Sequence, residues 1–555
     1  MSETTTLASR LSTLTDEFLE ALFDANPSAA RYFGLPAWDG RLPDLGESGL
    51  RRRVEELDRF AARLDRIQED GLSPAERVDL HVLRHECGRE RFEIVAKRIW
   101  HRDPLRYLDE LGVTGYLVRD YAPLRDRASG LCRHLEGVPR LLDAARENLD
   151  GPLDPTVLDT AIRAFESWAT FVDEDLAAAL EGADEGDAVL RRALVQARNG
   201  AAQEARRFAE FLVEKRRLAK PGTYAIGAEL LTGMLRREEG VHVPLSRILE
   251  LGRADLERNR DLLRETAARI DAASTPAEIM HRIKSDHPGA AEVLPFTREL
   301  MGELREFLVQ RDIVSIPTDT ECRVEKTPPY LSWSFAMMNG TPCLAEQEYP
   351  GIYYVTPPAA DWDEQRTEEW LTEFSRAGLA NTSVHEAWPG HFLHGLHIRR
   401  NPSRAVRISH AYSSAEAWAH YSEQLMVEEG FRGDDPELRM IQLGDALLRN
   451  VRLLVSIGLH TGGLSVDEAV WMFREDALLS EQAARTEAER GTFDPGYLNY
   501  TLGKLMLLKL REDVRKARGD DFSLRDFHDD FLYWGMAPVP IVREAMLGSG
   551  AGSPL

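Results

Sequence analysis

The sequence predicts a large, mainly α-helical protein in two lobes, with one small antiparallel β-sheet ahead of a helix that carries a cluster of histidines. Two observations support this fold class. Apolar residues recur at helical spacing through most of the 555 residues, beginning with Leu7, Leu11 and Leu14. Residues 313–357 are instead rich in proline, valine, isoleucine, tyrosine and threonine, a composition that favours short strands and turns.

The N-terminal part, residues 6–219, is a run of amphipathic helices whose polar faces carry arginine, glutamate and aspartate. Residues 182–187 form an acidic break between two long helices. No heptad is sustained, so packing within the chain is favoured over a coiled coil. We expect an N-terminal helical lobe over residues 1–220 and a second lobe over residues 221–555 that carries the chemical motifs. The two lobes could also form one continuous unit.

Charge and cysteine content exclude several classes of partner. The chain has 93 acidic and 69 basic side chains and a formal charge of −24, which argues against nucleic acid and anionic membranes. Its four cysteines show no close pairing, as in a reducing compartment. No signal peptide is evident, and no apolar run approaches about 18 residues. We therefore expect a cytoplasmic protein with no nucleic-acid or membrane partner, and a homodimer is left open.

The segment 313–357 is expected to form the small antiparallel sheet, because Arg323-Val324-Glu325 alternates polar and apolar side chains between turn residues. An edge strand there could hold an extended peptide by backbone hydrogen bonds, a recurrent mode of peptide recognition. A purely structural β flap explains the same pattern equally well.

Four of the 15 histidines and one glutamate, Glu386, fall within residues 381–397. The histidines are His385, His391, His394 and His397. In the common zinc-protease motif His-Glu-x-x-His, the two ligands lie four residues apart on one helix face and the glutamate acts as general base. Here the first two histidines lie six residues apart, which on a regular helix separates them by about 240°.

The Pro389-Gly390 pair removes this obstacle. Pro389 has no N–H to bond the carbonyl of His385 and its ring clashes with that carbonyl, so we expect the helix to bulge, and Gly390 tolerates the resulting backbone. With two extra residues absorbed in the bulge, His385 and His391 could face one metal ion. The alternative is that the later histidines form only a polar helix stripe, but the His-Glu pair and the Pro-Gly break favour a metal.

A second helix is expected over residues 414–425, where apolar residues recur at helical spacing. Glu416 and His420 share one face of it with Glu423. A zinc site of this class needs a third protein ligand and an open position for water. We assign Glu416 as the third ligand. Glu423 and His420 would surround the ligands without binding the metal, and Glu423 could pair with a histidine. The alternative for each is an ordinary solvated side chain.

Further candidates lie downstream. Residues 438–473 are expected to form two helices split near Gly462-Gly463. His460 and Tyr500 are candidate donors to the negative oxygen that develops during amide hydrolysis. Arg449 and Arg452 are candidate substrate contacts, although surface ion pairing is the favoured alternative in so acidic a protein.

These motifs resemble the bacterial family called domain of unknown function 885. The run His-Glu-Ala-Trp-Pro-Gly-His, followed by Glu-Ala-Trp-Ala-His-Tyr-Ser-Glu, is similar to the family's His-Glu-Ala-x-Pro-Gly-His and Glu-Gly-Trp-Ala-x-Tyr-x-Glu. Residues 349–355, which include the candidate substrate contact Tyr354, also look like a family segment, as do residues 458–460 and 495–511. The resemblance implies a largely helical, zinc-dependent, peptidase-like fold related to thermolysin-type and oligopeptidase-type enzymes.

The chain departs from the family pattern at three positions. His394 stands where many relatives have glutamine, Ser456 where they often have aspartate, and Thr501 where they have lysine. His394 could compete for the metal. The lost aspartate and lysine charges bear on substrate choice more than on the chemistry.

We therefore expect a zinc-dependent hydrolase of amide bonds, with a metallopeptidase of carboxypeptidase, dipeptidase or oligopeptidase type, acting on small peptides, as the favoured form. One zinc ion per chain, held by His385, His391 and Glu416, would activate water, although manganese or cobalt would also suit these ligands. Glu386 would act as general base, and His460 or Tyr500 would stabilise the oxyanion.

Two alternatives stay open. One is a metal-dependent tailoring enzyme of a biosynthetic pathway, acting on an amino-acid-derived metabolite. The other is a non-catalytic scaffold of the same fold, against which the complete His-Glu-His-Glu set speaks.

Overall fold

The computed structural model describes residues 7–180, 187–328, 335–359, 361–548 and 550–555. The prediction of a mainly helical protein is confirmed, with 72% of the structure in helices and 3% in strands. The acidic break at residues 182–187 lies outside the described residues except for Asp187, whose side chain accepts hydrogen bonds from the first amides of helix α11 (Ala188–Arg216). Among the described helices, none has both the length and the apolar character needed to cross a bilayer.

The chain divides into two compact units. The first comprises Met1–Ile226 with Leu344–Gln347, and the second comprises Gly227–Cys343 with Glu348–Leu555. The main division lies close to residue 220, where the sequence places a change of lobe. Leu344–Gln347 joins the first unit through the amide of Leu344, which donates to the carbonyl of Phe33, a long-range contact without a sequence signal.

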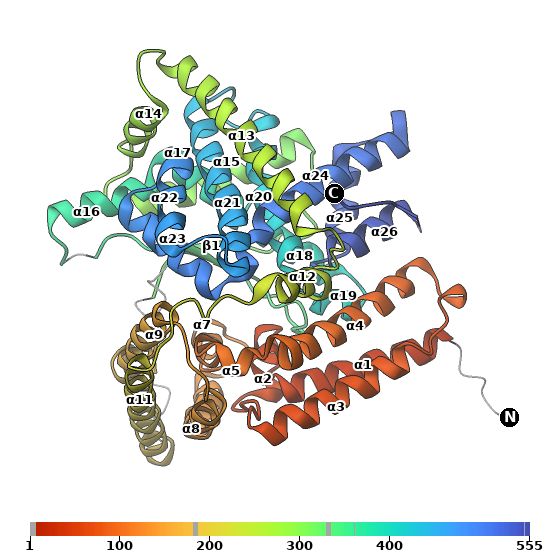
Figure 1. The fold of residues 1–555 in the computed structure, drawn as a ribbon, viewed down its shortest axis with the longest axis vertical. Helices are drawn as coiled ribbons and strands as arrows, with labels where there is room; N and C mark the ends of the chain where they lie inside the picture. The colour runs from red at the N-terminus through yellow and green to blue at the C-terminus, as the bar shows by residue number, and fades with distance from the viewer. Residues whose placement is uncertain (1–6, 181–186, 329–334, 360, 549) are drawn as a thin grey trace. The chain divides into compact units, whose positions relative to one another are not determined.

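The first unit is a series of helices joined by short turns, and its long helix α11 lies along α8 and α9 (Figure 1). Helix α4 begins with a reciprocal capping box between Ser73 and Glu76, which satisfies two amides at the helix start. Its elements are α1 (Leu7–Ala25), α2 (Pro27–Tyr32), η1 (Pro36–Trp38), α3 (Glu47–Leu64), η2 (Glu69–Gly71), α4 (Pro74–Phe92), η3 (Glu93–Lys97), α5 (Ile99–Arg102), α6 (Leu105–Glu110), α7 (Thr114–Val118), α8 (Leu124–Asn148), α9 (Pro155–Asp173), α10 (Asp175–Ala179) and α11.

The second unit holds the motifs singled out above. Its helices before the histidine cluster are α12 (Gly227–Glu238), α13 (Leu245–Ile270), α14 (Pro276–Lys284), α15 (Val293–Arg311), α16 (Glu364–Leu371), η5 (Thr372–Phe374) and α17 (Arg376–Glu386). From the cluster onwards they are α18 (His391–Arg400), α19 (Arg404–Ile408), α20 (Tyr412–Glu428), α21 (Pro436–Thr461), α22 (Val466–Ala477), α23 (Glu481–Phe493), η6 (Pro495–Leu498), α24 (Asn499–Arg518), η7 (Gly519–Asp521), α25 (Leu524–Tyr533) and α26 (Val539–Leu547). Helix α21 ends at Thr461, where Gly462 takes a left-handed conformation with φ of 78°, as the glycine pair predicts.

The expected small sheet is present and has three strands, β1 (Cys322–Lys326), β2 (Ala336–Asn339) and β3 (Gly351–Val355). Its order is β1-β3-β2. The pair of β2 and β3 is antiparallel as expected, whereas β1 pairs with β3 in parallel, so the sheet is mixed. The alternation of polar and apolar residues sets which side chains face inward but does not encode strand direction, which explains the difference.

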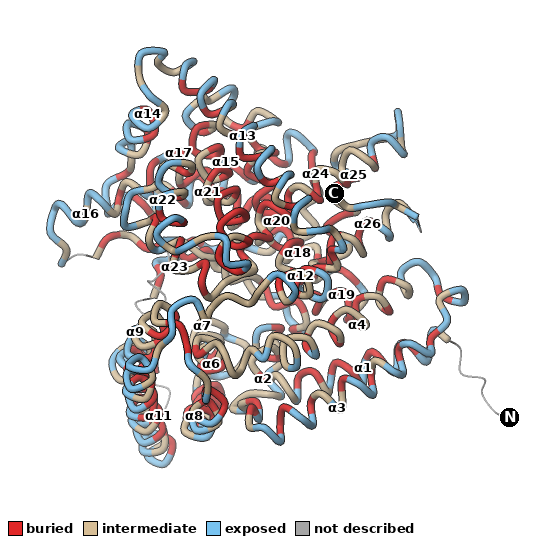
Figure 2. Tube along the Cα trace, viewed as in Figure 1, coloured by how far each residue is buried: buried red, intermediate tan, exposed pale blue. Residues whose placement is uncertain are grey.

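Helices α20 and α21 form the buried centre of the second unit (Figure 2). Helix α20 packs along α24, and α21 packs along α13. Gly503 permits the first contact, because a Cβ atom on that residue would lie 2.1 Å from the carbonyl oxygen of Ser413. Although α20 is surrounded by other helices, it carries the buried ionisable side chains of His420 and Glu423. Such groups are costly unless partnered, and their partners define the candidate site.

Candidate metal centre

The first two histidines of the cluster lie on two separate helices instead of one bulged helix. Helix α17 ends at Glu386 and α18 begins at His391, with residues 387–390 between them. The amide of Gly390 donates to the carbonyl of Val384, six residues earlier instead of the usual four. Pro389 cannot continue the helical hydrogen bonds because it has no N–H. This turn contains two residues more than a regular helical turn, and His391 therefore lies beside His385.

The short connection between α17 and α18 is fixed on both sides. A Cβ atom on residue 390 would lie 1.7 Å from the carbonyl oxygen of His385, so glycine is needed at this close approach. On the other side, Trp418 Nε1 of α20 donates to the carbonyl of Pro389 at 2.7 Å. Helix α20 thus holds the connection in place and also supplies the third ligand candidate.

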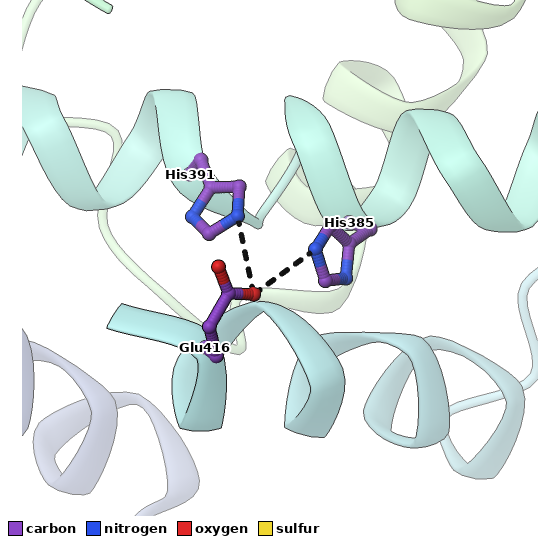
Figure 3. Close-up of side chains that lie close together, drawn as sticks. All are labelled: His385, His391 and Glu416. Carbon is purple, nitrogen blue, oxygen red and sulfur yellow. Dashed lines mark ion pairs between the residues drawn. The ribbon is translucent and has the colours of Figure 1, made fainter. Parts of the chain in front are cut away.

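His385, His391 and Glu416 converge, and their donor atoms all lie within 4.8 Å of one another (Figure 3). Glu416 Oε2 lies 3.4 Å from His385 Nε2 and 3.6 Å from His391 Nε2. These separations are longer than a usual N–H···O hydrogen bond of about 2.9 Å. They resemble the about 3.3 Å between two ligands of a tetrahedral zinc ion whose bonds are about 2.0–2.1 Å long. The spacing therefore fits a cation placed between the three side chains.

Charge and burial set the protonation of the three groups. Burial lowers the pKa of His391 to about 4 despite the neighbouring Glu416, which leaves the ring neutral at pH 7. Burial also disfavours a charge on His385, but Glu416 and Glu423 outweigh it and raise the pKa of His385 to about 10. Burial of Glu416 is overcome by the two histidines, His391 first, which hold its pKa at about 2. Without a metal the site therefore keeps one proton as its compensating positive charge, which a bound divalent cation would replace.

Glu423 supports His385 from the side opposite the other ligands. Glu423 Oε1 accepts hydrogen bonds from His385 Nδ1 at 2.6 Å and from Arg449 Nη2 at 2.9 Å, and Oε2 accepts from His420 Nδ1 at 3.3 Å. Burial opposes the carboxylate, but Arg449, followed by His420 and His385, holds the pKa of Glu423 well below its usual value. A histidine whose second nitrogen donates to a carboxylate is fixed in orientation and tautomer, as metal-binding histidines commonly are.

Arg449 and Arg452 both form ion pairs, but these pairs are buried instead of lying on the surface. The Arg449 side chain is 11% exposed and pairs with Glu423, and Arg452 pairs with both oxygens of Glu487 at 2.7 and 2.8 Å. Both guanidinium groups also lie near the ring of Tyr500, with their Cζ atoms 5.7 and 5.0 Å from its centroid.

Tyr500 retains its phenolic proton at neutral pH. Burial, followed by the negative charge of Glu416, raises the pKa of Tyr500, although Arg452 and other arginines act in the opposite direction. The protonated phenol keeps an O–H that can donate a hydrogen bond.

Glu386 directly follows the ligand candidate His385 and contacts the sheet. The amide of Thr356 donates to the carbonyl of Phe335, which fixes the residues of β2 that bond to β3. Every second residue of β2 bonds in this way, and the N–H of Met338, which lies between two such residues, points away from β3. The Met338 N–H donates instead to the Glu386 carboxylate. Burial, followed by the charge of Glu416, raises the pKa of Glu386 to about 7, against the opposing charge of His385. A carboxylate with such a pKa can accept and return a proton near neutral pH.

Three predicted site residues lie elsewhere. His394 Nε2 contacts the carbonyl oxygen of Gly535 at 3.0 Å, within a fully buried environment, so it does not compete for the metal. His460 Nε2 contacts the carbonyl oxygen of Gly491 at 2.8 Å and lies about 16 Å along α21 from Arg449. We therefore give His460 no role in stabilising an oxyanion. Tyr354 is buried in β3, where it pairs with Met337.

Sequence reasoning missed two contributors. The backbone N–H of Met338 leaves no trace in a side-chain pattern. Asp445 lies one helical turn before Arg449, 4.0 Å from its guanidinium group, and accepts a hydrogen bond from Asn381 at 2.7 Å. The i, i+4 spacing of Asp445 and Arg449 was visible in the sequence and could have identified this ion pair.

Two solved bacterial structures share this fold. A "putative lipoprotein of unknown function" from Shewanella oneidensis matches with a TM-score of 0.81 and 20% identity, over 97% of this chain and 99% of that one. A "putative lipoprotein" from Colwellia psychrerythraea matches with a TM-score of 0.82 and 18% identity, over 98% and 99% of the two chains. Metallocarboxypeptidase 1 of Trypanosoma cruzi, at 10% identity over 99% of this chain and 94% of that one, has a TM-score of only 0.35, too low to transfer a function. The chain has no match among curated proteins.

These comparisons correct one expectation and establish the family. The cytoplasmic location expected from the sequence is contradicted, because both similar bacterial structures are of putative lipoproteins. Residues 27–546 match the bacterial protein family of unknown function DUF885. Since this match spans nearly the whole chain, the protein belongs to the DUF885 family.

Proposed function

We propose that this protein is a zinc-dependent hydrolase of amide bonds that acts on small peptides. The observation that carries the proposal is the convergence of two imidazoles and one carboxylate, His385, His391 and Glu416, beside the carboxylate of Glu386. Two histidines and a glutamate with an open fourth position are a recurrent ligand set of catalytic zinc sites. One zinc ion per chain is proposed.

The donor set fits the cation. Glu416 Oε2 is buried and accepts no hydrogen bond from any described residue, although two imidazole nitrogens lie nearby. A buried carboxylate oxygen without such a bond is costly, and a cation at this point would satisfy it. When bound, zinc would polarise the scissile carbonyl and lower the pKa of a water molecule.

Glu386 is the proposed general base. Its pKa of about 7 and its place next to His385 suit a group that takes a proton from water and later gives it to the leaving amine. The carboxylate also accepts a hydrogen bond from the Met338 N–H of β2. Tyr500 is the proposed donor to the oxygen that becomes negative in the transition state, since its raised pKa preserves the O–H.

The preference for peptides is supported by the sheet beside the proposed base. Strand β2 lies at one edge of the sheet, and Met338 in this strand contacts Glu386. An extended peptide that adds to a sheet edge is recognised by its backbone. Carboxypeptidase, dipeptidase and oligopeptidase activities all remain compatible with this arrangement.

The two departures from the family pattern that bear on substrate choice, Ser456 and Thr501, lie at buried positions. Ser456 Oγ donates to the carbonyl of Pro495 at 2.7 Å, and Thr501 is only 1% exposed. Both side chains are buried, so these positions give no support for a changed substrate class.

Metal content per chain, measured by mass spectrometry on wild type and His391→Ala, is the first test. About one zinc per wild-type chain and none in the variant are expected. Absence of zinc from the wild type would overturn the proposal and favour the non-catalytic scaffold.

A peptide-library screen with wild type and Glu386→Gln tests the chemistry. The variant should retain zinc and lose peptide cleavage, because glutamine cannot accept the proton. An active Glu386→Gln enzyme would reject Glu386 as the base. Zinc binding without cleavage of any peptide by the wild type would reject the peptidase assignment.

A further inference from the structure

Helix α21 carries a buried arginine, Arg449, to which the proposed chemistry gives no role. Its side chain is 11% exposed, and Nη2 lies 2.9 Å from Glu423 Oε1. Its other terminal nitrogen, Nη1, donates to Glu423 Oε2 at 3.4 Å. The guanidinium group therefore contacts both oxygens of one carboxylate. Such a bidentate contact fixes the rotation of the carboxylate, which a contact to a single oxygen would leave free.

The carboxylate oxygen that Arg449 contacts most closely is also the one that binds His385. Glu423 Oε1 accepts a hydrogen bond from His385 Nδ1 at 2.6 Å, and Arg449 Nη2 lies 3.4 Å from the same nitrogen. The other nitrogen of the ring, Nε2, lies 3.4 Å from Glu416 Oε2. The position of Glu423 Oε1 therefore sets how the His385 ring is turned towards the ligand cluster.

Arg449 is held from its other side by a contact that leads back to the helix of His385. Asp445, one turn earlier on α21, lies with its Oδ2 atom 4.0 Å from Arg449 Nη1. The same Oδ2 accepts a hydrogen bond from Asn381 Nδ2 at 2.7 Å. Asn381 lies one turn before His385 on α17, on the same helix face. The contacts thus run from α17 through α21 and α20 and return to α17.

A second buried arginine on α21 has a different partner. Arg452 lies three residues after Arg449, is 10% exposed and donates to both oxygens of Glu487 at 2.7 and 2.8 Å. Both arginines also lie near the ring of Tyr500. The two are therefore alike in helix, burial, ion pairing and aromatic contact, and they differ in that only Arg449 pairs with the carboxylate that binds His385.

We propose that Arg449 is a positioning residue for the metal ligand His385. Its guanidinium group, held by Asp445, orients Glu423 so that Oε1 accepts the His385 Nδ1–H and Nε2 of the ring faces Glu416. The inference rests on the proposed function, which makes His385 a ligand. It gives Arg449 a role towards the ligand instead of the substrate contact considered from the sequence.

Zinc affinity, measured by competition with a chelator, tests this role by the direction of the change. Arg449 is a cation close to the ligands, so if only its charge mattered, removing it would strengthen the binding of a divalent cation. A positioning role predicts the opposite, and Arg449→Met should bind zinc about tenfold more weakly. Wild-type or tighter zinc binding by a folded Arg449→Met would overturn the proposal.

Arg449→Lys separates the bidentate contact from the charge. Lysine keeps the charge but has no planar pair of donors, so this variant should bind zinc more tightly than Arg449→Met and less tightly than the wild type. Wild-type affinity in Arg449→Lys would show that charge alone suffices and would reject the bidentate contact as the cause.

Arg452→Met is the matched control for damage to α21. It removes a buried arginine of similar exposure and leaves Glu487 without this partner, so its free energy of unfolding should fall as in Arg449→Met. Its zinc affinity should nevertheless stay within about threefold of the wild type. Urea denaturation and chelator competition on both variants provide the comparison. Equal losses of zinc affinity in the two would mean general damage to the helix and would reject the proposal.

A double substitution tests the route through Glu423. In the Glu423→Gln background Arg449 has no carboxylate to orient, so adding Arg449→Met should weaken zinc binding no further. A further tenfold loss there would show that Arg449 acts by another route and would reject the proposal.

The hydrogen bond between His385 and Glu423 gives a readout that needs neither metal nor activity. In chelator-treated, ¹⁵N-histidine-labelled protein, the His385 Nδ1–H should give a proton NMR signal far downfield, assigned by its loss in Glu423→Gln. Arg449→Met should shift this signal upfield, and Arg452→Met should leave it in place. An unchanged signal in Arg449→Met would reject the positioning role. A wild type that binds no zinc would overturn the proposed function, while the NMR signal would still decide whether Arg449 orients Glu423.

Discussion

The clustered histidines divide into two pairs with different surroundings. His385 and His391 face the carboxylate of Glu416. The second pair, His394 and His397, contacts backbone carbonyl oxygens at 3.0 and 2.9 Å. A carbonyl fixes a ring in place but brings no net charge, and burial lowers the pKa of His394 to about 3. The local density of histidines therefore does not define the site; the carboxylates of α20 select which histidines can bind a cation.

Replacing one histidine from each pair should separate the two roles most strongly. His385→Ala should lose zinc and activity completely. His394→Ala should keep zinc but lower the free energy of unfolding by about 2–3 kcal/mol, because it leaves a cavity and an unpaired carbonyl of Gly535. Zinc content and urea denaturation of both variants provide the measurements. Loss of zinc from a folded His394→Ala would erase the distinction between the pairs.

The same contrast applies to the two candidate oxyanion donors. Tyr500→Phe should lower kcat about 10²–10³-fold with zinc content unchanged, since one donor to the developing charge is lost. His460→Gln should leave kcat within about threefold, because His460 is bound to the carbonyl of Gly491. Steady-state kinetics on a cleaved peptide checks both. A large loss in His460→Gln with normal zinc and normal stability would return His460 to the mechanism.

The sequence predicted the helical class, the small sheet and the grouping of His385, His391 and Glu416, because periodicity and spacing are local properties. It expected a bulged helix where two helices meet, since Pro389 signals an interruption without setting its extent. It could not separate His394 from the ligands, because the carbonyl of Gly535 lies far along the chain. Arg449 is similar: its sequence favours a surface ion pair, and only the packing of α20 against α21 shows its contact with Glu423.

Lys504 of α24, which is 1% exposed, should carry a stability cost that Lys509 on the same helix, with a side chain 42% exposed, does not. Burial is the main cause that lowers the pKa of Lys504 from 10.5 to about 8. The unfolded chain therefore binds this proton more tightly, so the cost is complete below pH 8 and disappears as the pH rises towards 10.5. Its upper bound at pH 7 is about 3 kcal/mol.

Lys504→Met should accordingly be more stable than the metal-free wild type at pH 7, by up to about 3 kcal/mol. This advantage should shrink as the pH rises above 8. Urea denaturation of chelator-treated wild type, Lys504→Met and Lys509→Met across this range measures it. A Lys504→Met that is less stable than the wild type at pH 7 would show that the buried ammonium group stabilises the core instead of costing stability.

Glu423→Gln tests whether the carboxylate at His385 Nδ1 matters as much as that of Glu416 at His385 Nε2. The amide keeps the size of the side chain but removes the charge, and its NH₂ group would meet donors from His385, His420 or Arg449. Zinc affinity should fall about 10–100-fold, less than the complete loss in His385→Ala, because the three ligands themselves remain. Glu428→Gln on the same helix is the control: its side chain is 37% exposed and pairs with Arg511 at 3.5 Å. Equal zinc affinity in Glu423→Gln and Glu428→Gln would mean that His385 needs no charged partner at Nδ1. The carboxylate of Glu416 alone would then distinguish the two histidine pairs.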